Sequence, residues 1–295
     1  MKLSELGEDK VVRRLMRGLK LDRRVVLGPG DDCAVVRTAG NYQLLKSDCV
    51  IEGVHFLRDA DPLWVGWKAM CRSISDVASM GGVPLDALVT VAIRSDTDFE
   101  WLKKLYRGLR KAASVYRVNL VGGETAKSPG PVFLSVSLTG TAENGKYVSR
   151  SGGKNGDWLF VTGNLGGSIG GKHLRFSPRV KEGRWLVSRF PIHAMMDLSD
   201  GLGSDLPRLA AASGLGFEVD LKDLPLSKGC SPENALRDGE DYELLFAVPR
   251  VVKSRLETAW MKAFPRLRLT AVGRLVNSGH REFAHKGFDH FRGGR

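Results

Sequence analysis

The stretch Gly28-Pro29-Gly30-Asp31-Asp32-Cys33-Ala34 places two adjacent carboxylates in a tight turn between short apolar runs. Residues 25–27 before the turn and 34–36 after it are predicted strands, because glycine and proline mark the turn between them. Aspartate is common in turns, so this segment alone would indicate only a turn. An unpaired carboxylate beside apolar residues is costly to bury, however, and the same placement recurs along the chain.

The recurring feature is an acidic residue at the end of an apolar run. It is found in Lys46-Ser47-Asp48, in Ser75-Asp76, in Asp197-Leu198-Ser199-Asp200-Gly201 and in Gly239-Glu240-Asp241-Tyr242-Glu243. Each segment alone has an ordinary structural interpretation, such as a helix N-cap for Asp197 or Asp200. Recurrence in both halves of the chain favours a shared site. Because Mg²⁺ takes oxygen ligands from a few carboxylates and from substrate phosphates, we predict a magnesium–phosphate site assembled from several loops.

The composition is that of a globular protein with a strongly basic balance. The 295 residues include Lys+Arg 45 and Asp+Glu 33, and 42% of the chain is hydrophobic. This length allows two domains, and we find no apolar run of the roughly 20 residues that span a bilayer. The polar start and four cysteines without a C-x-x-C pair predict a reducing, cytoplasmic setting and no membrane association.

The net charge of +12 raises the possibility of nucleic-acid binding. The basic residues are scattered, and no aromatic-interleaved RNA-binding motif accompanies them, so a solvated basic surface is the favoured interpretation. Such a surface would also attract anionic small molecules such as ATP. A basic nucleic-acid-binding protein therefore stays an alternative from a different functional class.

Periodicity predicts alternating helices and strands, so both halves are expected to be mixed α/β. Expected helices cover 8–19, 99–115 and 251–264, with others from Pro62 toward Gly81 and near Gly201. Expected strands cover 42–45, 85–93, 119–121, 132–139, 158–161, 217–221, 242–248 and 267–272. A composition break, Arg150-Ser151-Gly152-Gly153-Lys154-Asn155-Gly156-Asp157, predicts a boundary between an N-terminal domain of residues 1–149 and a C-terminal domain of residues 150–295.

A glycine-rich stretch, residues 163–173, satisfies two short catalytic patterns. Gly166 to Lys172 fits G-x-x-x-x-G-K, but His173 follows where a phosphate-binding loop has Ser or Thr. Ser168 fits the hydrolase pattern G-x-S-x-G, with Asp197 and His285 later in the chain, but it lies five residues after Gly163. Both stay minor alternatives to a strand-to-helix turn, whose backbone amides could still approach a phosphate.

Eight segments, in this order, resemble the thiamine-monophosphate kinase family. They are Gly28 to Ala34, Ser47-Asp48 with Gly53-Val54-His55-Phe56, Ser75 to Gly81, Gly122-Gly123-Glu124-Thr125, Arg150-Ser151-Gly152, Asp197 to Leu202, Gly239 to Leu244 and Gly287-Phe288-Asp289-His290-Phe291. The resemblance implies transfer of the γ-phosphate of ATP to thiamine monophosphate, giving thiamine diphosphate. It also implies the aminoimidazole ribonucleotide synthetase-like fold. In that fold an N-terminal half-barrel sheet pairs in a homodimer, and a C-terminal α/β sandwich-like domain completes the active-site cleft.

Site residues follow from the resemblance position by position. The implied ligands of several Mg²⁺ ions are Asp32, Ser47, Asp48, Asp76, Glu124, Asp197 and Asp200. Implied ATP contacts are Gly122, Gly123, Arg150 and Ser199, and implied contacts to thiamine monophosphate are His55, Glu240 and Phe288. No covalent nucleophile or essential base is expected, because phosphoryl transfer requires mainly positioning and charge neutralisation. Another ATP-dependent synthetase of the same fold stays an alternative.

Overall fold

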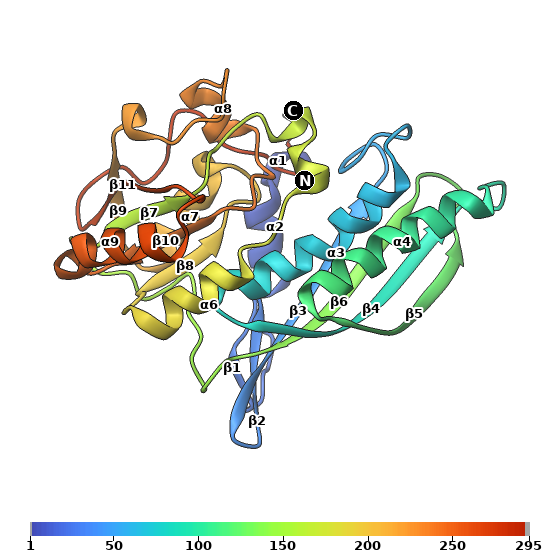
Figure 1. Ribbon diagram of the computed structural model, residues 1–295, viewed down its shortest axis with the longest axis horizontal. Helices are drawn as coiled ribbons and strands as arrows, with labels where there is room; N and C mark the ends of the chain where they lie inside the picture. The colour runs from blue at the N-terminus through green and yellow to red at the C-terminus, as the bar shows by residue number, and fades with distance from the viewer. Residues whose placement is uncertain (1, 293–295) are drawn as a thin grey trace.

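The chain folds into two α/β halves, each built on its own sheet, in a computed structural model that describes residues 2–292. Figure 1 shows the N-terminal half in blue to green beside the C-terminal half in yellow to red. Mixed α/β structure in both halves is as predicted. In the described part of the chain, no helix combines the length and apolar character needed to cross a membrane.

The N-terminal sheet has the strand order β1-β2-β3-β6-β4-β5. Its strands are β1 (Val25–Leu27), β2 (Ala34–Thr38), β3 (Asn41–Ile51), β4 (Val83–Ile93), β5 (Asn119–Lys127) and β6 (Phe133–Thr141). Neighbours are antiparallel except β4 and β5, which are parallel and connected through α4 (Phe99–Tyr116). Along β3, Leu44 and Val50 are buried whereas Leu45 and Ser47 are exposed. One face of the sheet therefore packs against helices and the other is open.

Helix α3 (Pro62–Ser79) is the central element of the N-terminal half, and most of its residues are buried. Its start is fixed by Asp61, whose side chain accepts a hydrogen bond from the Leu63 amide at 2.9 Å, and by proline in the first turn. It packs closely on α4, because a Cβ on Gly66 would lie 2.0 Å from the Leu105 carbonyl oxygen. Two short helices, α1 (Leu3–Leu6) and α2 (Glu8–Leu15), precede the sheet.

The C-terminal sheet has the order β8-β10-β7-β11-β9, with every neighbouring pair antiparallel. Its strands are β7 (Trp158–Thr162), β8 (Ala194–Asp197), β9 (Gly216–Val219), β10 (Leu244–Val248) and β11 (Leu269–Val276). The helices are α5 (Lys172–Arg175), α6 (Val180–Arg189), α7 (Leu202–Ala212), α8 (Pro232–Arg237) and α9 (Lys253–Ala263). Single 3₁₀ turns are η1 (Ser168–Gly170), η2 (Leu221–Asp223) and η3 (Arg250–Val252).

Both faces of the C-terminal sheet are covered by helices. Leu159 and Val161 of β7 belong to a buried cluster with Leu206 of α7, whereas Phe160 belongs to a second cluster with Trp260 of α9. Successive residues of a strand point to opposite faces, so burial of both faces requires a continuous apolar run. The sequence of β7 satisfies that requirement, and the result is the expected sandwich-like arrangement of helix, sheet and helix.

Several element boundaries differ from the prediction. Helix α2 ends at Leu15 rather than residue 19, and β5 continues through Gly122 to Lys127 where a loop was expected. Helix α6 and strand β8 were not predicted. Strand β8 has only four residues, all buried, so it shows no alternation from which a strand could be inferred. The boundary at 149/150 stays a prediction; it lies between the end of β6 and the start of β7.

Candidate active site

Three buried carboxylates meet where the two halves of the chain touch. Asp32 lies in the turn before β2, Asp76 in the last turn of α3 and Asp197 at the end of β8. One ligand oxygen from each lies within 4.8 Å of the others, and the residues are at most 7% exposed. A hard divalent cation takes oxygen ligands of this type, so the carboxylate cluster fits Mg²⁺.

Helix α3 contributes a polar stripe that supports this cluster. Ser75 Oγ donates to Asp197 Oδ2 and Ser79 Oγ donates to Asp32 Oδ2, each at 2.5 Å. The sequence prediction named only Asp76 on this helix. The missed signal was a polar residue at every third or fourth position, Lys68, Arg72, Ser75 and Ser79, because that spacing places side chains on one face of a helix. Apart from Ser73 and Asp76, the other residues of this helix are apolar.

Two cationic side chains lie against the carboxylates. Arg150 Nε donates to Asp32 Oδ1 at 2.8 Å, and the Arg150 backbone amide donates to Asp31 Oδ2 at 2.9 Å. Lys46 Nζ lies 2.8 Å from Asp76 Oδ1 and 3.5 Å from Asp48 Oδ1. Asp48 is thereby joined to the cluster through Lys46 and Asp76.

The electrostatics indicate that the ionised carboxylates are not fully compensated. Burial raises the pKa of Asp197 to about 7, and the neighbouring Asp32 adds to the rise. Burial also raises the pKa of Asp76, although the Lys46 ammonium opposes this effect. For Asp48, burial acts in the same direction, but Lys46 and Arg72 outweigh it and lower its pKa to about 2. Raised carboxylate pKa values from desolvation and like charge are typical of functional sites, and a bound cation would offset both causes.

The three residues predicted to contact the substrate, His55, Glu240 and Phe288, are connected to one another through Lys68 and His290. Lys68 Nζ, which is fully buried, lies 2.6 Å from Glu240 Oε2 and donates to the His55 carbonyl oxygen, also at 2.6 Å. The His55 ring lies 5.4 Å from the His290 ring, whose centroid is 4.8 Å from that of Phe288. Burial lowers the pKa of His55 to about 3, so this imidazole is neutral.

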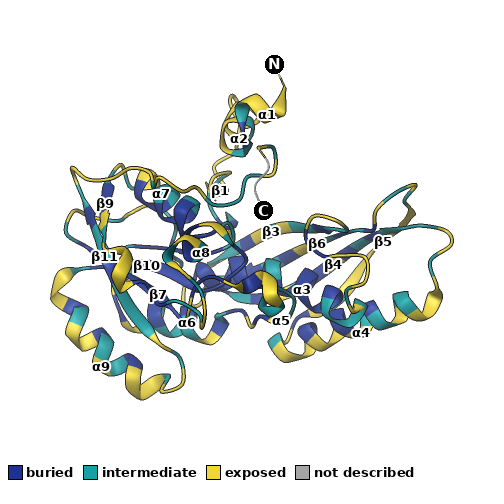
Figure 2. Ribbon diagram, turned by 90° about the horizontal axis from the view of Figure 1, so that it is seen from above, coloured by how far each residue is buried: buried dark blue, intermediate teal, exposed yellow. Residues whose placement is uncertain are grey.

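A cleft of about 1160 Å³ adjoins the carboxylate cluster. It is lined by α2, the turn at residues 29–31, α7 and the C-terminal tail, and α2 lies at the junction of the two halves (Figures 1 and 2). Arg150 and Ser199, predicted to contact ATP, line this cleft together with Lys46. Asp200 also lines the cleft, where its Oδ2 lies 2.5 Å from Arg208 Nη1 and outside the three-carboxylate cluster.

Two of the predicted metal ligands, Ser47 and Glu124, do not point toward the carboxylate cluster of their own chain. Ser47 Oγ lies 3.2 Å from Ser137 Oγ of β6, on the open face of the sheet and opposite Lys46 and Asp48. Glu124 lies opposite Thr90 in the β4–β5 ladder, and Thr90 lies opposite Ser135 in the β4–β6 ladder. Directly opposite residues share a face of the sheet, so Glu124 lies on the same open face as Ser135 and Ser47. The prediction that both side chains join the other ligands is therefore not observed within a single chain. The physical reason is strand alternation, because Ser47 and Asp48 must face opposite ways.

The glycine pair predicted to contact ATP also lies on β5. At Gly123, a Cβ would lie 1.8 Å from the Val89 carbonyl oxygen, so the close strand approach itself requires glycine. Gly122 pairs with Leu88 in the same parallel ladder. Within one chain, close packing of β4 on β5 therefore explains Gly123, whereas at Gly122 a Cβ would lie 3.4 Å from Leu88 Cδ2, an ordinary contact, and the φ of 154° is what favours glycine.

The glycine-rich stretch acts as a structural turn. Ser168 is buried, and its hydroxyl donates to the Gly239 carbonyl oxygen at 2.5 Å, so it is not presented as a nucleophile. Lys172 Nζ lies 3.4 Å from Glu243 Oε1. The stretch therefore packs against residues 239–243, which favours the strand-to-helix turn over a phosphate-binding loop or a hydrolase elbow.

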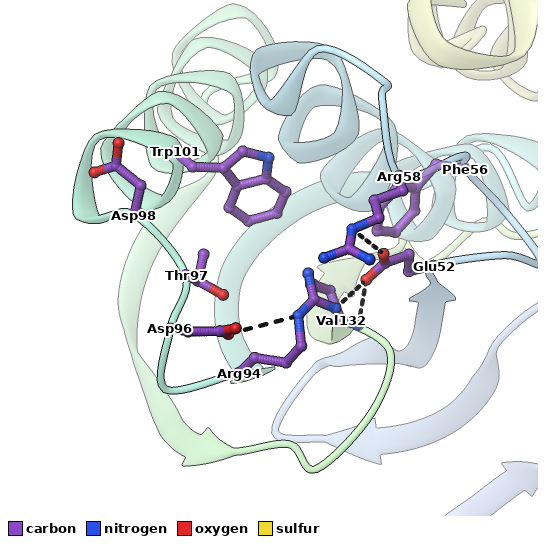
Figure 3. Close-up of a pocket in the computed structure, with 9 residues that line it drawn as sticks. All are labelled: Glu52, Phe56, Arg58, Arg94, Asp96, Thr97, Asp98, Trp101 and Val132. Atoms are coloured by element: carbon purple, nitrogen blue, oxygen red, sulfur yellow. Dashed lines mark hydrogen bonds and ion pairs between the residues drawn. The ribbon is translucent and has the colours of Figure 1, made fainter.

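A separate, smaller pocket of about 230 Å³ lies beside the β4–α4 loop (Figure 3). Its arginines are paired: Arg94 Nη1 lies 2.8 Å from Glu52 Oε2, and Arg58 Nε lies 3.8 Å from Glu52 Oε1. None of the clustered carboxylates lines it. The carboxylate cluster and its cleft are therefore the better candidate for the active site.

Known proteins match both halves of this architecture. The family described as AIR synthase related protein, N-terminal domain, matches residues 30–142, and its C-terminal domain matches residues 144–286. These matches define the class: an AIR synthase-related protein with its candidate site at the junction of the two domains.

Individual relatives narrow the assignment. Thiamine-monophosphate kinase of Rhodopirellula baltica is 37% identical over 86% of this chain and 84% of its own length. The enzyme of that name from Aquifex aeolicus is 34% identical over 99% of this chain and 100% of its own. A solved structure of AaThiL complexed with AMPPCP and TMP superposes with a TM-score of 0.85 at 32% identity, covering 98% of this chain and 99% of that one. The chain belongs to the thiamine-monophosphate kinase family and is an enzyme of the kinase class.

Proposed function

We propose that this protein transfers the γ-phosphate of ATP directly to thiamine monophosphate, giving thiamine diphosphate, in a Mg²⁺-assisted in-line reaction. The observation that carries the proposal is the buried carboxylate cluster of Asp32, Asp76 and Asp197 beside the cleft. Support also comes from the similar AaThiL structure, which is complexed with AMPPCP and TMP. Its cytoplasmic setting stays a prediction from the sequence.

The donor and the acceptor would bind next to each other beside the cluster, because the Phe288 amide donates to the carbonyl oxygen of Asp200, which lines the cleft. The cleft lined by Arg150 and Ser199 would take ATP, with the Arg150 guanidinium directed at phosphate oxygens. His55, Glu240 and Phe288 would take the thiamine portion of the acceptor. Mg²⁺ bound by the carboxylate cluster would neutralise phosphate charge and act as a Lewis acid. The acceptor phosphate is ionised near neutral pH, so the neutral His55 is not required as a base.

A substrate comparison tests this proposal. We expect ADP release that requires both thiamine monophosphate and MgCl₂, with thiamine diphosphate identified as the product by mass spectrometry. Unphosphorylated thiamine serves as the control acceptor and should give no product. A gel shift with DNA or RNA tests the nucleic-acid alternative. ATP consumption only with a different acceptor would instead favour another synthetase of this fold.

Replacement of Phe288 by alanine tests the acceptor side of the site. The half-buried Phe288 ring can contact the flat pyrimidine or the cationic thiazolium, which is worth roughly 0.5–2 kcal/mol when desolvated. We therefore expect Phe288→Ala to raise KM for thiamine monophosphate by roughly 3- to 30-fold with KM for ATP unchanged. Phe291→Ala in the same tail is the matched control. An equal rise for both substrates would indicate that Phe288 only anchors the tail.

We further infer that the open face of the N-terminal sheet is covered by a second copy of this chain. Leu88 and Val121 are 48% and 59% exposed and line a hollow of about 430 Å³ on this face with Leu45 and Ser47. An exposed apolar sheet face of this kind is typical of an association surface. A two-fold dimer would bury it symmetrically.

Sedimentation of a charged variant tests the dimer. At micromolar concentration we expect the native chain to sediment as a dimer and Leu88→Glu as a monomer, because the glutamate would be buried against its symmetry mate. Val251→Glu is the matched control, since Val251 is 89% exposed in η3, far along the chain from this sheet. A native monomer would contradict the proposed dimer.

A further inference from the structure

One of the cations in the candidate site is a side chain of the protein, the ammonium of Lys46. Lys46 lies on the face of β3 that packs toward α3, because it shares strand parity with the buried Leu44 and Val50. Its side chain is 19% exposed, and its Nζ lies 2.8 Å from Asp76 Oδ1 and 3.5 Å from Asp48 Oδ1. The ammonium therefore lies between two carboxylates that both belong to the predicted metal-binding set.

The carboxylates offer two positions for a cation. One is the cluster of Asp32, Asp76 and Asp197, whose oxygens lie within 4.8 Å of one another. The other lies between Asp48 and Asp76, and the Lys46 ammonium already occupies it. A divalent ion and an ammonium cannot both contact the same pair of carboxylate oxygens without strong repulsion at that distance.

We propose that the Lys46 ammonium is a built-in cation that replaces one divalent ion between Asp48 and Asp76. The inference rests on the proposed Mg²⁺-dependent function and concerns how many ions the site needs. A lysine ammonium is a compact point charge with three donors, so contact with two aspartates leaves one donor available. Lys46 also lines the large cleft, and that donor can reach a phosphate oxygen of a bound nucleotide.

The alternative is that Lys46 only fills the position until metal arrives. In that case a divalent ion would displace the ammonium, and Lys46 would weaken metal binding without changing the number of ions. Stoichiometry therefore separates the two cases, whereas affinity alone does not.

Counting bound Mn²⁺, a paramagnetic substitute for Mg²⁺, tests the proposal on the full chain without nucleotide. We expect Lys46→Met, which keeps the length and removes the charge, to bind one Mn²⁺ more per chain than the native protein. Lys46→Arg, which keeps the charge, should match the native count. Equal counts for the native protein and Lys46→Met would overturn the proposal, even if the variant bound Mn²⁺ more tightly.

The native protein provides a second measurement that does not depend on folding of a variant. Lys46 should stay protected from acetylation by acetic anhydride when MgCl₂ is added, as followed by mass spectrometry of its peptide. Increased acetylation with MgCl₂ would show displacement and overturn the proposal. Failure of the native protein to bind any Mn²⁺ is a different result, because it would overturn the proposed metal site itself.

Discussion

Asp76→Asn is expected to reduce kcat by about 10³-fold or more, because metal-based charge stabilisation is worth several kcal/mol and each 1.36 kcal/mol is tenfold in rate. Asp76 is shared by the carboxylate cluster and by the Lys46 contact, so its substitution affects both parts of the site. Asparagine keeps the shape of the side chain but supplies a neutral oxygen. The loss should therefore appear in catalysis and in metal binding together.

The same substitution should not destabilise the metal-free protein. Burial raises the pKa of Asp76, the Lys46 ammonium opposes that rise, and the like charges of Asp48 and Asp197 add to it, so the ionised form is disfavoured in the fold. In the variant the Lys46 ammonium keeps its contact with Asp48. We expect the Tm without metal to be unchanged or higher, and the increase in Tm on adding MgCl₂ to be lost. Asp96→Asn is the matched control, because the Asp96 side chain is 81% exposed. Turnover near the native value at saturating MgCl₂ would contradict the assigned role of Asp76.

The sequence was sufficient to predict two of the three elements that carry this cluster, the turn before β2 and helix α3, whereas strand β8, which ends at Asp197, was not predicted. A turn between two strands, the end of a long helix and the end of a buried segment each placed one aspartate, and the fold brings Asp32, Asp76 and Asp197 together. It was not sufficient to predict the direction of side chains along β3. Polar residues occupy both faces at Lys46, Ser47 and Asp48, so the alternation that normally identifies the buried face is lost there.

Contacts between segments that are distant in the sequence also could not be predicted from the sequence pattern. Lys68 and Glu240 are 172 positions apart, and nothing local to α3 indicates which residue its ammonium meets. The partner loop has an unusual backbone, since Glu240 and Tyr242 have φ values of 54° and 52°. Bulky residues rarely adopt this left-handed region, and such strain is concentrated at functional sites. Only the three-dimensional structure identifies it.

Lys68→Met is expected to lower the free energy of unfolding by about 3–5 kcal/mol, which is the usual cost of removing one partner of a buried ion pair. Both side chains are almost completely buried, with exposures of 0% and 4%, so the Glu240 carboxylate would lose its nearest cation without gaining water. Methionine has a similar length and no charge, so cavity formation is a minor contribution. Urea unfolding followed by tryptophan fluorescence measures the effect.

A double-mutant cycle separates the ion pair from the other contacts of Lys68. In Lys68→Met/Glu240→Gln no charge is left buried alone, so we expect the double variant to regain at least half of the stability lost in Lys68→Met. Lys104→Met is the matched control, because Lys104 lies 3.0 Å from Asp61 but both side chains are at least 40% exposed. That exposed pair should contribute less than about 1 kcal/mol. If the double variant is no more stable than Lys68→Met, the cost comes instead from the lost hydrogen bond to the His55 carbonyl oxygen, and Lys68 stabilises the loop at His55 rather than the charge of Glu240.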